Sequence, residues 1–320
     1  MVSRFLRFVL VAGAALASAT AAAQPYPSKP VKIIIPWVSG GAVEALVRVV
    51  ANKMTDLGQP LVLEARPGAN GTIGAAAVAK SAPDGYTLLV GHVGPLAISP
   101  AMQAMQYDSI KDFEPIGQLV SGPTLLVIRP DIPVKTVREL VDYAKVNPGK
   151  LSYGSVGIGS TTHLAGEVLA LATGINIVHV PYKGAPPIVT DLLGGRISFA
   201  FAAVTSVLPQ ARAGQLRVLG ITSLQRSPLL PEFAPVSETV PGFELSSWHG
   251  LLAPAGTPRA VVARVHESMA AALKQPEVIQ WLKENGLDPV GSRPEEFGAY
   301  IRGETAKWAK IVKDAKIPPQ

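Results

Sequence analysis

The sequence predicts an α/β protein of two lobes, on three observations. Two stretches far apart in the chain share one pattern, in which an apolar strand leads into a glycine-rich loop and then into an amphipathic helix. Apolar segments of strand length alternate with segments of helical spacing, which favours mainly parallel sheets flanked by helices. The chain also has 320 residues, more than a single hydrophobic core usually holds.

The first of the two stretches begins the predicted first lobe. Residues 31–36 are apolar apart from Lys32, as in a strand buried in a parallel sheet. A loop with Ser39, Gly40 and Gly41 leads into a predicted helix over residues 42–57. Further strands are predicted at 61–64 and 87–90. Because the carboxyl ends of parallel strands meet at one edge, we expect loops 37–42, 68–72 and 91–94 to share a rim where ligands bind.

The second stretch, residues 151–171, repeats the pattern. A strand end at 151–153 is followed by Gly154, Gly157 and Gly159, and then by a helix with Leu164, Val168 and Leu171 at helical spacing. The helix has three N-cap candidates, Ser160, Thr161 and Thr162. A glycine-rich loop that opens a helix directs backbone N–H groups at one point and suits an anion. Both stretches could equally be ordinary βα turns, in which glycine is common.

The remaining segments set the predicted domain boundaries. We expect strands at 116–120 and 125–128, or one crossing strand broken at Gly122 and Pro123, where we place the first hinge. Residues 136–139 fit a helix capping box, strands are predicted at 177–180, 197–202 and 216–222, and the Pro-rich segment 227–242 should cross back. Three C-terminal helices follow. We predict one lobe from residues 24–122 and 246–320 and the other from 123–245.

Residues 1–23 are typical of a secretory signal peptide. Arg4 and Arg7 precede an apolar run over residues 8–17, and Ala21, Ala22 and Ala23 form a small-residue cleavage site. The run is too short for a comfortable membrane span, which argues against the alternative of a retained anchor. We expect cleavage after Ala23 and location in the periplasm. The chain has no cysteine, so it has neither disulfides nor thiolate metal ligands.

Composition and motifs argue against several functions. The net charge is +6 and falls to +4 without the two leader arginines; Lys and Arg are scattered, so no nucleic-acid partner is expected. The nucleophile pattern G-x-S-x-G fails because residue 153 is Tyr, and Ser160 with His163 suits a helix start better than catalysis. No nucleotide motif and no metal-ligand spacing is present among the histidines, which are His92, His163, His179, His249 and His266. We therefore expect no enzyme, metal or cofactor.

Over nearly the whole mature length, the chain resembles the substrate-binding proteins of tripartite tricarboxylate transporters, the TctC or Bug family. Each motif is weak alone, but all occur in the family's order. The matching stretches are YPSKPV at 26–31, EARPGANG at 64–71, APDGYTLL at 82–89, YD at 107–108 with KDFEPI at 111–116, STTHLAGE at 160–167, VHVPYKG at 178–184 and GLLAPAGTP at 250–258.

The resemblance implies a type II periplasmic-binding-protein fold, in which two α/β lobes close on a small ligand. It implies a receptor that holds a carboxylate through backbone N–H groups and delivers it to membrane transporter subunits, or that reports it to a sensor kinase, as a monomer. Carried onto this chain, the ligand-binding residues are Trp37, Ser39, Gly40, Gly41 and Ala42 with Ala69, Asn70 and His92 from the first lobe, and Ser155, Gly157, Ser160, Thr161, Thr162, His163 and Ala202 from the second.

The chain departs from the family pattern in the first loop. Where the family commonly has Gly-Gly-x-Thr-Asp, this chain has Gly40, Gly41, Ala42, Val43 and Glu44. Valine removes a hydroxyl that could bind ligand, and His92 stands where a smaller residue is expected. We expect His92 to offer a donor to the distal end of the ligand, or else to lie on the rim. An uncharged or aromatic ligand is therefore an alternative to a small carboxylate, and an enzyme on the same scaffold is a further one.

Overall fold

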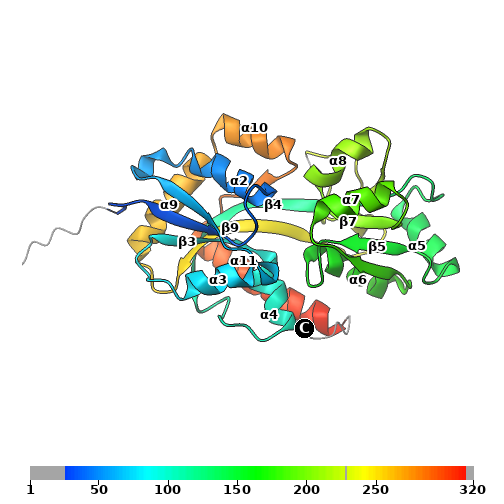
Figure 1. The fold of residues 1–320 in the computed structure, drawn as a ribbon, viewed down its shortest axis with the longest axis horizontal. Coiled ribbons are helices and arrows are strands. Elements are labelled where there is room, and N and C mark those ends of the chain that lie inside the picture. Colours follow the sequence, from blue (N-terminus) through cyan, green and yellow to red (C-terminus); the bar gives the residue numbers. More distant parts are fainter. Residues whose placement is uncertain (1–25, 228, 315–320) are drawn as a thin grey trace, which may run out of the picture.

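The computed structural model describes residues 26–227 and 229–314. The predicted leader, residues 1–23, lies outside the described residues. The chain forms two α/β lobes joined by long strands, and its strands follow the order β2-β1-β3-β9-β4-β7-β5-β6 (Figure 1). Within the described ranges, no helix combines the length and the apolar character needed to cross a membrane.

The first lobe is built on three parallel strands, β1 (Val31–Ile35), β2 (Leu61–Ala65) and β3 (Thr87–His92). Between them run α2 (Ala42–Ala51), the short turns η1 (Thr55–Leu57) and η2 (Ala69–Gly71), and α3 (Thr72–Ala79). Strand β1 has its apolar side chains buried on both faces, as the unbroken run of isoleucines requires. The loop after β1 therefore leaves at the carboxyl edge of the sheet, where α2 begins.

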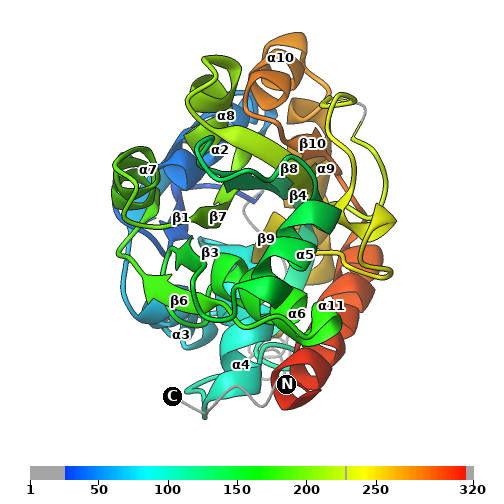
Figure 2. The ribbon, with the colours of Figure 1, turned by 90° about the vertical axis from the view of Figure 1, so that its right-hand side faces the viewer.

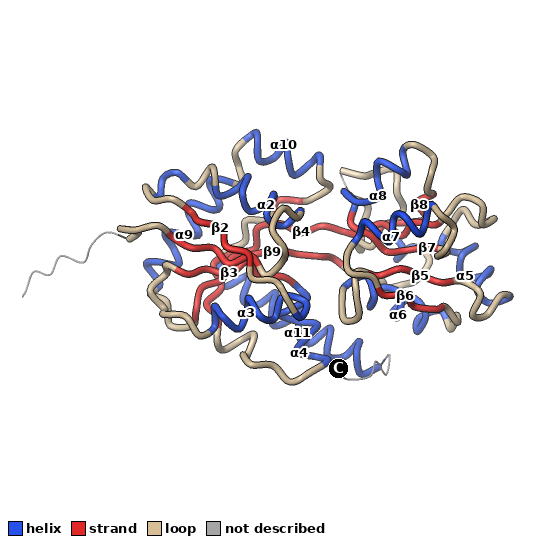
Figure 3. The backbone as a smooth tube through the Cα atoms, viewed as in Figure 1, coloured by secondary structure: helices blue, strands red, loops and turns tan. Residues whose placement is uncertain are grey.

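Two long strands join the lobes, β4 (Phe113–Ile128) and β9 (Ser246–Pro254) (Figure 3). Strand β4 pairs with β9 as far as Pro123 and with β7 (Phe199–Ala203) from Thr124 onward. The possible break at Gly122 and Pro123 is therefore absent, because β4 continues and only changes its partner there. Proline has no N–H to donate, and a change of partner is a position where a strand tolerates it.

The second lobe contains the parallel strands β5 (Ser152–Ser155), β6 (Val178–Pro181) and β7, with β8 (Arg217–Ile221) antiparallel to β4. Its helices are α5 (Val137–Val146), α6 (Thr161–Thr173), α7 (Ala185–Leu193) and α8 (Val204–Arg212). Viewed from this lobe, α5 and α6 lie on one side of its strands and α7 and α8 on the other (Figure 2). Alternate residues of β7 are buried in two separate clusters, with Phe199 and Phe201 in one and Ala200 and Ala202 in the other.

The chain returns to the first lobe through β9, which adds antiparallel pairs with β3 and β4, so the sheet is mixed rather than purely parallel. Residues 229–242, which belong to the segment predicted to cross, instead stay beside β8 through a bridge between Ile221 and Pro235, and they contain the turn η4 (Val236–Glu238). The chain therefore returns to the first lobe only after this segment, along β9, which is paired with β4.

The C-terminal helices are α9 (Arg259–Ala272), α10 (Pro276–Glu284) and α11 (Pro294–Asp314), with the short strand β10 (Asp288–Pro289) paired to β4. Helix α11 packs along β4 and against the turn η3 (Gly94–Ile98) and α4 (Ser99–Met102). The indole N–H groups of the buried Trp248 and Trp308 both donate to Glu304, at 3.3 and 3.2 Å. This shared acceptor fixes α11 to the first residues of β9, beside the junction of the lobes.

Candidate functional site

A cavity of about 220 Å³ lies between the two lobes. It is bounded by the start of α2, the carboxyl end of β3, the point where β4 changes its partner, the start of α8, the first residues of β9 and the turn after α10. Its lining residues are Trp37, Ala42, Val43, Leu46, His92, Gly122, Pro123, Thr124, Ala203, Val204, Thr205, Ser247, His249, Trp281, Asn285, Gly286 and Leu287. Of the residues predicted to bind ligand, Trp37, Ala42 and His92 lie in this wall.

Two helices from opposite lobes begin at this cavity. The N-cap of α2 is Gly41 and that of α8 is Ala203, and neither accepts a hydrogen bond from the following turn through a side chain. The first N–H groups of a helix have no partner inside the helix, and they carry the positive end of its dipole. The start of each helix is therefore open to an anion, and the two face the same space.

Glu44 modifies the start of α2. Its Oε2 atom accepts a hydrogen bond from Gly40 N at 2.9 Å, and its other oxygen pairs with Arg48. The backbone hydrogen bond from Gly40, followed by the bond from Arg48, lowers the pKa of Glu44, so this carboxylate is charged at neutral pH. Because Gly40 N is already occupied, the donors left for an anion in this loop are those of Gly41 and the first turn. Glu44 thus leaves one fewer backbone donor for an anion, and Val43 adds an apolar side chain to the cavity wall.

Aromatic and imidazole rings form the side of the cavity beneath this loop. The ring centroid of Trp37 lies 5.1 Å from that of His92 and 6.0 Å from that of His249, and the two histidine rings are 4.8 Å apart. The register of β3 with β9 places His92 directly opposite His249. Burial, with the neighbouring His249 ring adding to it, lowers the pKa of His92 well below its usual value, and burial lowers the pKa of His249 to about 4. Both rings are neutral at pH 7.

The two histidines differ in their partners. Gly94 N donates to Nδ1 of His92 at 3.0 Å, so the proton of this neutral ring is on Nε2, which donates to Ser247 Oγ at 2.8 Å. In this tautomer His92 cannot remove the Ser247 proton, and the serine hydroxyl is left free to donate. No described residue hydrogen-bonds to the His249 ring, and its Nδ1 atom is buried. Ser247, rather than His92 itself, is therefore the donor available to the cavity.

A second, smaller cavity of about 180 Å³ also lies between the lobes. Its wall includes Ala69 and Asn70 from the first lobe and Ile158 and Gly159 from the second. Asn70 Nδ2 donates across the junction to Gly159 O at 3.3 Å. The structure thus divides the predicted first-lobe residues between two cavities, because β1 and β2 end at different points along the junction.

The start of α6, predicted as the anion site of the second lobe, has a side-chain cap, and side chains of its first turn also bind two N–H groups of the loop before it. Ser160 Oγ accepts from His163 N at 3.2 Å, Thr162 Oγ1 accepts from Val156 N at 3.0 Å, and His163 Nδ1 accepts from Gly159 N at 3.2 Å. Thr161 Oγ1 is buried without a partner among the described residues.

None of the predicted residues of this turn and its strand lines the 220 Å³ cavity; they are Ser155, Gly157, Ser160, Thr161, Thr162 and His163. Ser39, Gly40 and Gly41 precede the lining residue Ala42, and Ala202 lies one residue before the lining residue Ala203.

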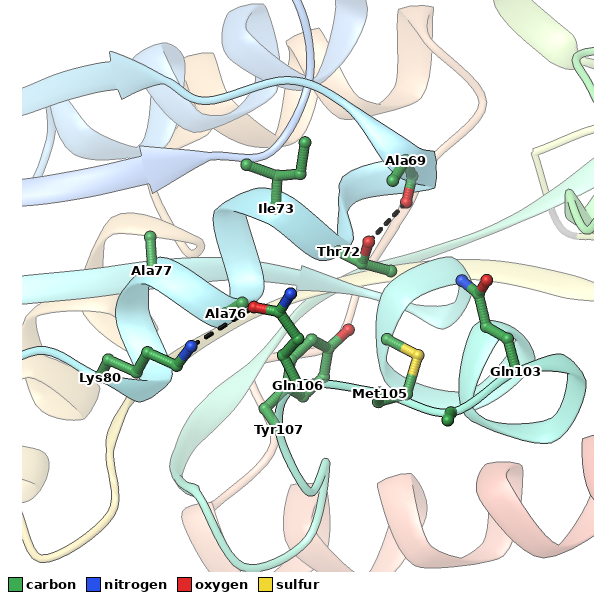
Figure 4. Close-up of a pocket in the computed structure, with 11 residues that line it drawn as sticks. Ala69, Thr72, Ile73, Ala76, Ala77, Lys80, Gln103, Met105, Gln106 and Tyr107 are labelled. Carbon is green, nitrogen blue, oxygen red and sulfur yellow. Dashed lines mark hydrogen bonds between the residues drawn. The ribbon is translucent and has the colours of Figure 1, made fainter. Parts of the chain in front are cut away.

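A wider groove of about 470 Å³ lies on the first lobe between α3 and the segment that follows α4 (Figure 4). Small, polar and larger apolar side chains line it, the last from Ile73, Met105 and Tyr107, and Lys80 Nζ donates to Gln106 Oε1 at 3.3 Å across one end. All of its residues belong to one lobe, so closure of the lobes would not enclose a ligand there. Groups of His, Asp or Glu able to hold a metal ion are also absent from residues 26–227 and 229–314.

Sequence reasoning missed the start of α8, the serine and histidine of β9 and the turn at residues 285–287. The start of α8 follows a buried strand directly, without the glycine loop that marked the other helix starts. Gly286 is in the left-handed conformation (φ +63°), and a side chain there would meet Val204. This close approach brings the turn after α10 against the second lobe. An Asn-Gly pair after a helix is visible in sequence, but its partner across the lobes is not.

The chain matches the family model "Tripartite tricarboxylate transporter family receptor" over residues 46–317. It is 36% identical to the UPF0065 protein in the tcbD-tcbE intergenic region of Pseudomonas sp. (strain P51), across 96% of this chain and 94% of that protein. It is 35% identical to the solved structure of R. palustris Rpa4515 with adipate, with a TM-score of 0.83 over 92% of this chain and all of that one. MatC from Rhodopseudomonas palustris with bound malate is 30% identical, with a TM-score of 0.78 over 90% of this chain and all of that one.

Proposed function

The chain belongs to the tripartite tricarboxylate transporter receptor family, and on that premise we propose that it captures a small carboxylate between its lobes. Two related structures hold carboxylates, adipate in one and malate in the other. The single observation that carries the proposal in this chain is that α2 and α8, one from each lobe, begin without a side-chain cap at one cavity. An anion there would complete the first turns of both helices, and so would hold the lobes together.

The geometry also explains how the anion can be held without a cation. No Lys or Arg lines the cavity, but backbone N–H groups at helix starts bind a carboxylate by charge-assisted hydrogen bonds. We propose that the described residues around the cavity bind without catalysing turnover. Ser247 and His92 are the one hydroxyl–imidazole pair in its lining, and the His92 tautomer leaves the serine without a base.

We propose that the receptor works in the periplasm as a monomer, after export by residues 1–23. Delivery of the carboxylate to membrane transporter subunits follows from the family, and a sensor kinase is the alternative recipient. Neither requires a cofactor. A bound carboxylate that bridges α2 and α8 would give either partner the same signal, a closed pair of lobes.

Matched acids and amides test the proposal. Each carboxylic acid is compared with its primary amide by thermal shift and calorimetric titration on the mature protein. An acid at a hundred times its dissociation constant should raise the free energy of unfolding by about 2.7 kcal/mol, and its amide should have no comparable effect. If amides bind as tightly as their acids, the helix starts do not act as an anion site and the proposal fails.

A further inference from the structure

The wall of the 220 Å³ cavity beyond the two helix starts carries no charge. Its side chains include the indoles Trp37 and Trp281 and the aliphatic residues Val43, Leu46 and Leu287, and no Lys, Arg, Asp or Glu is among them. A second carboxylate on the ligand would be removed from water here without a cation or a helix start to compensate it, which costs several kcal/mol. The chemistry of this wall suits an uncharged, flat body.

The register of β4 sets the order in which the polar groups follow one another along the cavity. Thr124 pairs with Ala203 at the start of α8, Gly122 pairs with Ser247, and Val120 pairs with His249. The four residue-to-residue steps from Thr124 back to Val120 span about 13 Å of strand. The start of α8 is thus at one end, Ser247 is in the middle and His249 is at the far end. Ser247 and His249 are two residues apart, so their side chains leave β9 on the same face.

The far end offers hydrogen bonds but no charge. The Ser247 hydroxyl is free to donate, because its oxygen already accepts from His92. The buried Nδ1 atom of His249 has no partner among the described residues, and the χ2 angle of histidine has a broad distribution. An unpartnered buried imidazole costs free energy that a hydroxyl on the ligand would recover. The ring that contacts Trp37 is therefore positioned to accept a hydrogen bond from a neutral group.

We infer that the receptor selects a monocarboxylate with a single aromatic ring, preferably one that carries a hydroxyl group opposite its carboxylate. This inference rests on the proposed function, since the carboxylate is placed at the starts of α2 and α8. The ring lies against Trp37 and Trp281, where offset or edge contacts between aromatic groups are favourable. The hydroxyl reaches His249 and Ser247. The volume of 220 Å³ is below the range of about 300–1,000 Å³ usual for drug-sized ligands, so one ring fills it.

The test titrates the mature protein with four probes, 4-hydroxyphenylacetate, phenylacetate, phenylacetamide and adipate. We expect 4-hydroxyphenylacetate to bind at least tenfold more tightly than adipate, and about fivefold more tightly than phenylacetate. Adipate binding as tightly as the aromatic acids, or more tightly, overturns the inference and leaves the proposed function standing. Phenylacetamide binding as tightly as phenylacetate overturns the proposed function, whereas the failure of both aromatic acids to bind overturns the inference.

Substitutions at His249 and Ser247 test where the hydroxyl group of the ligand binds. In His249→Phe, which keeps an aromatic ring, the advantage of 4-hydroxyphenylacetate over phenylacetate should fall to less than twofold. The matched control is His266→Phe on α9. His266 Nδ1 is also buried without a partner among the described residues, but His266 does not line the cavity. Thermal melting of each variant shows that it folds. If the hydroxyl advantage survives in both His249→Phe and Ser247→Ala, the orientation is wrong.

Discussion

The starts of α2 and α8 differ from the start of α6 in one respect, the absence of a side-chain cap. All three follow a strand and direct backbone N–H groups along a helix axis. At α6, Ser160 and Thr162 accept hydrogen bonds from the backbone, and His163 accepts the one from Gly159. At α2 and α8 the N-cap is glycine or alanine, neither of which has a side-chain oxygen that could accept a hydrogen bond. A serine or threonine after a glycine loop therefore marks a closed helix start, and its absence marks an open one.

Gly41→Val should block the uncapped start of α2 and abolish most of the binding affinity. Gly41 has φ −81°, so valine fits the backbone, and its Cβ would lie 3.4 Å from Val38 O. The side chain would stand beside the first turn of α2, where the carboxylate is proposed to lie. We expect at least a hundredfold loss of affinity, about 2.7 kcal/mol, with an unchanged melting temperature. Calorimetric titration with the acid that gives the largest thermal shift measures it.

The control for Gly41→Val is Gly303→Val on α11. A Cβ at Gly303 meets no atom within 4 Å, and a side chain in place of glycine favours a helix. This variant makes the same chemical change far from the cavity and should bind as the wild type does. Unchanged affinity in Gly41→Val would remove α2 from the site.

Acid should open the start of α6, because it protonates buried histidines there. The rings of His163 and His179 are 4.1 Å apart, and burial lowers the pKa of each to about 4, with the charge of His163 adding for His179. Histidine in the unfolded chain titrates near pH 6.5. Between pH 6.5 and 4 the unfolded state binds more protons, so the free energy of unfolding falls as the pH falls through this window.

The expected loss between pH 7 and 4.5 is on the order of 2 kcal/mol for His163, measured by urea unfolding. Protonation removes the acceptor of the Gly159 amide, so hydrogen exchange at that amide should accelerate as well. In His163→Asn the slope of stability against pH should be shallower. An equal slope in the variant would show that other groups control the acid response.

Much of the fold follows from local pattern. The isoleucine run of β1, the Thr136 cap of α5 and the Ser160 cap of α6 were predicted and are present, because each depends on residues close in sequence. The cavity depends on distant pairs. Ala203 lies beside Thr124, and Gly286 packs against Val204, only because β4 changes its partner and α10 ends at the second lobe. No local pattern indicates those contacts, so the sequence predicted Ser160 to Thr162 for the anion and gave no sign that α8 begins at the 220 Å³ cavity.

Ser160→Ala sharpens the comparison by turning a closed helix start into an open one. Loss of the N-cap should reduce the free energy of unfolding by about 1 kcal/mol, and affinity for the same acid should change less than threefold. Urea unfolding and titration measure the two effects. Thr136→Ala on α5, whose N-cap accepts from Glu139 N at 3.1 Å, is the matched control for stability. A tenfold loss of affinity in Ser160→Ala alone would return the anion site to α6.

Asn70→Gly has the smallest expected effect and separates the two cavities between the lobes. Asn70 has φ +52°, a conformation that glycine adopts freely, so the substitution removes the side chain without straining the backbone. It deletes one neutral hydrogen bond across the junction, to Gly159 O, worth about 0.5–1 kcal/mol. That bond lies in the wall of the 180 Å³ cavity, which shares no lining residue with the 220 Å³ cavity. If the carboxylate binds at α2 and α8, affinity should therefore fall less than fivefold in a titration. If the acid binds in the 180 Å³ cavity instead, Asn70 is part of its wall, and the loss should match that of Gly41→Val.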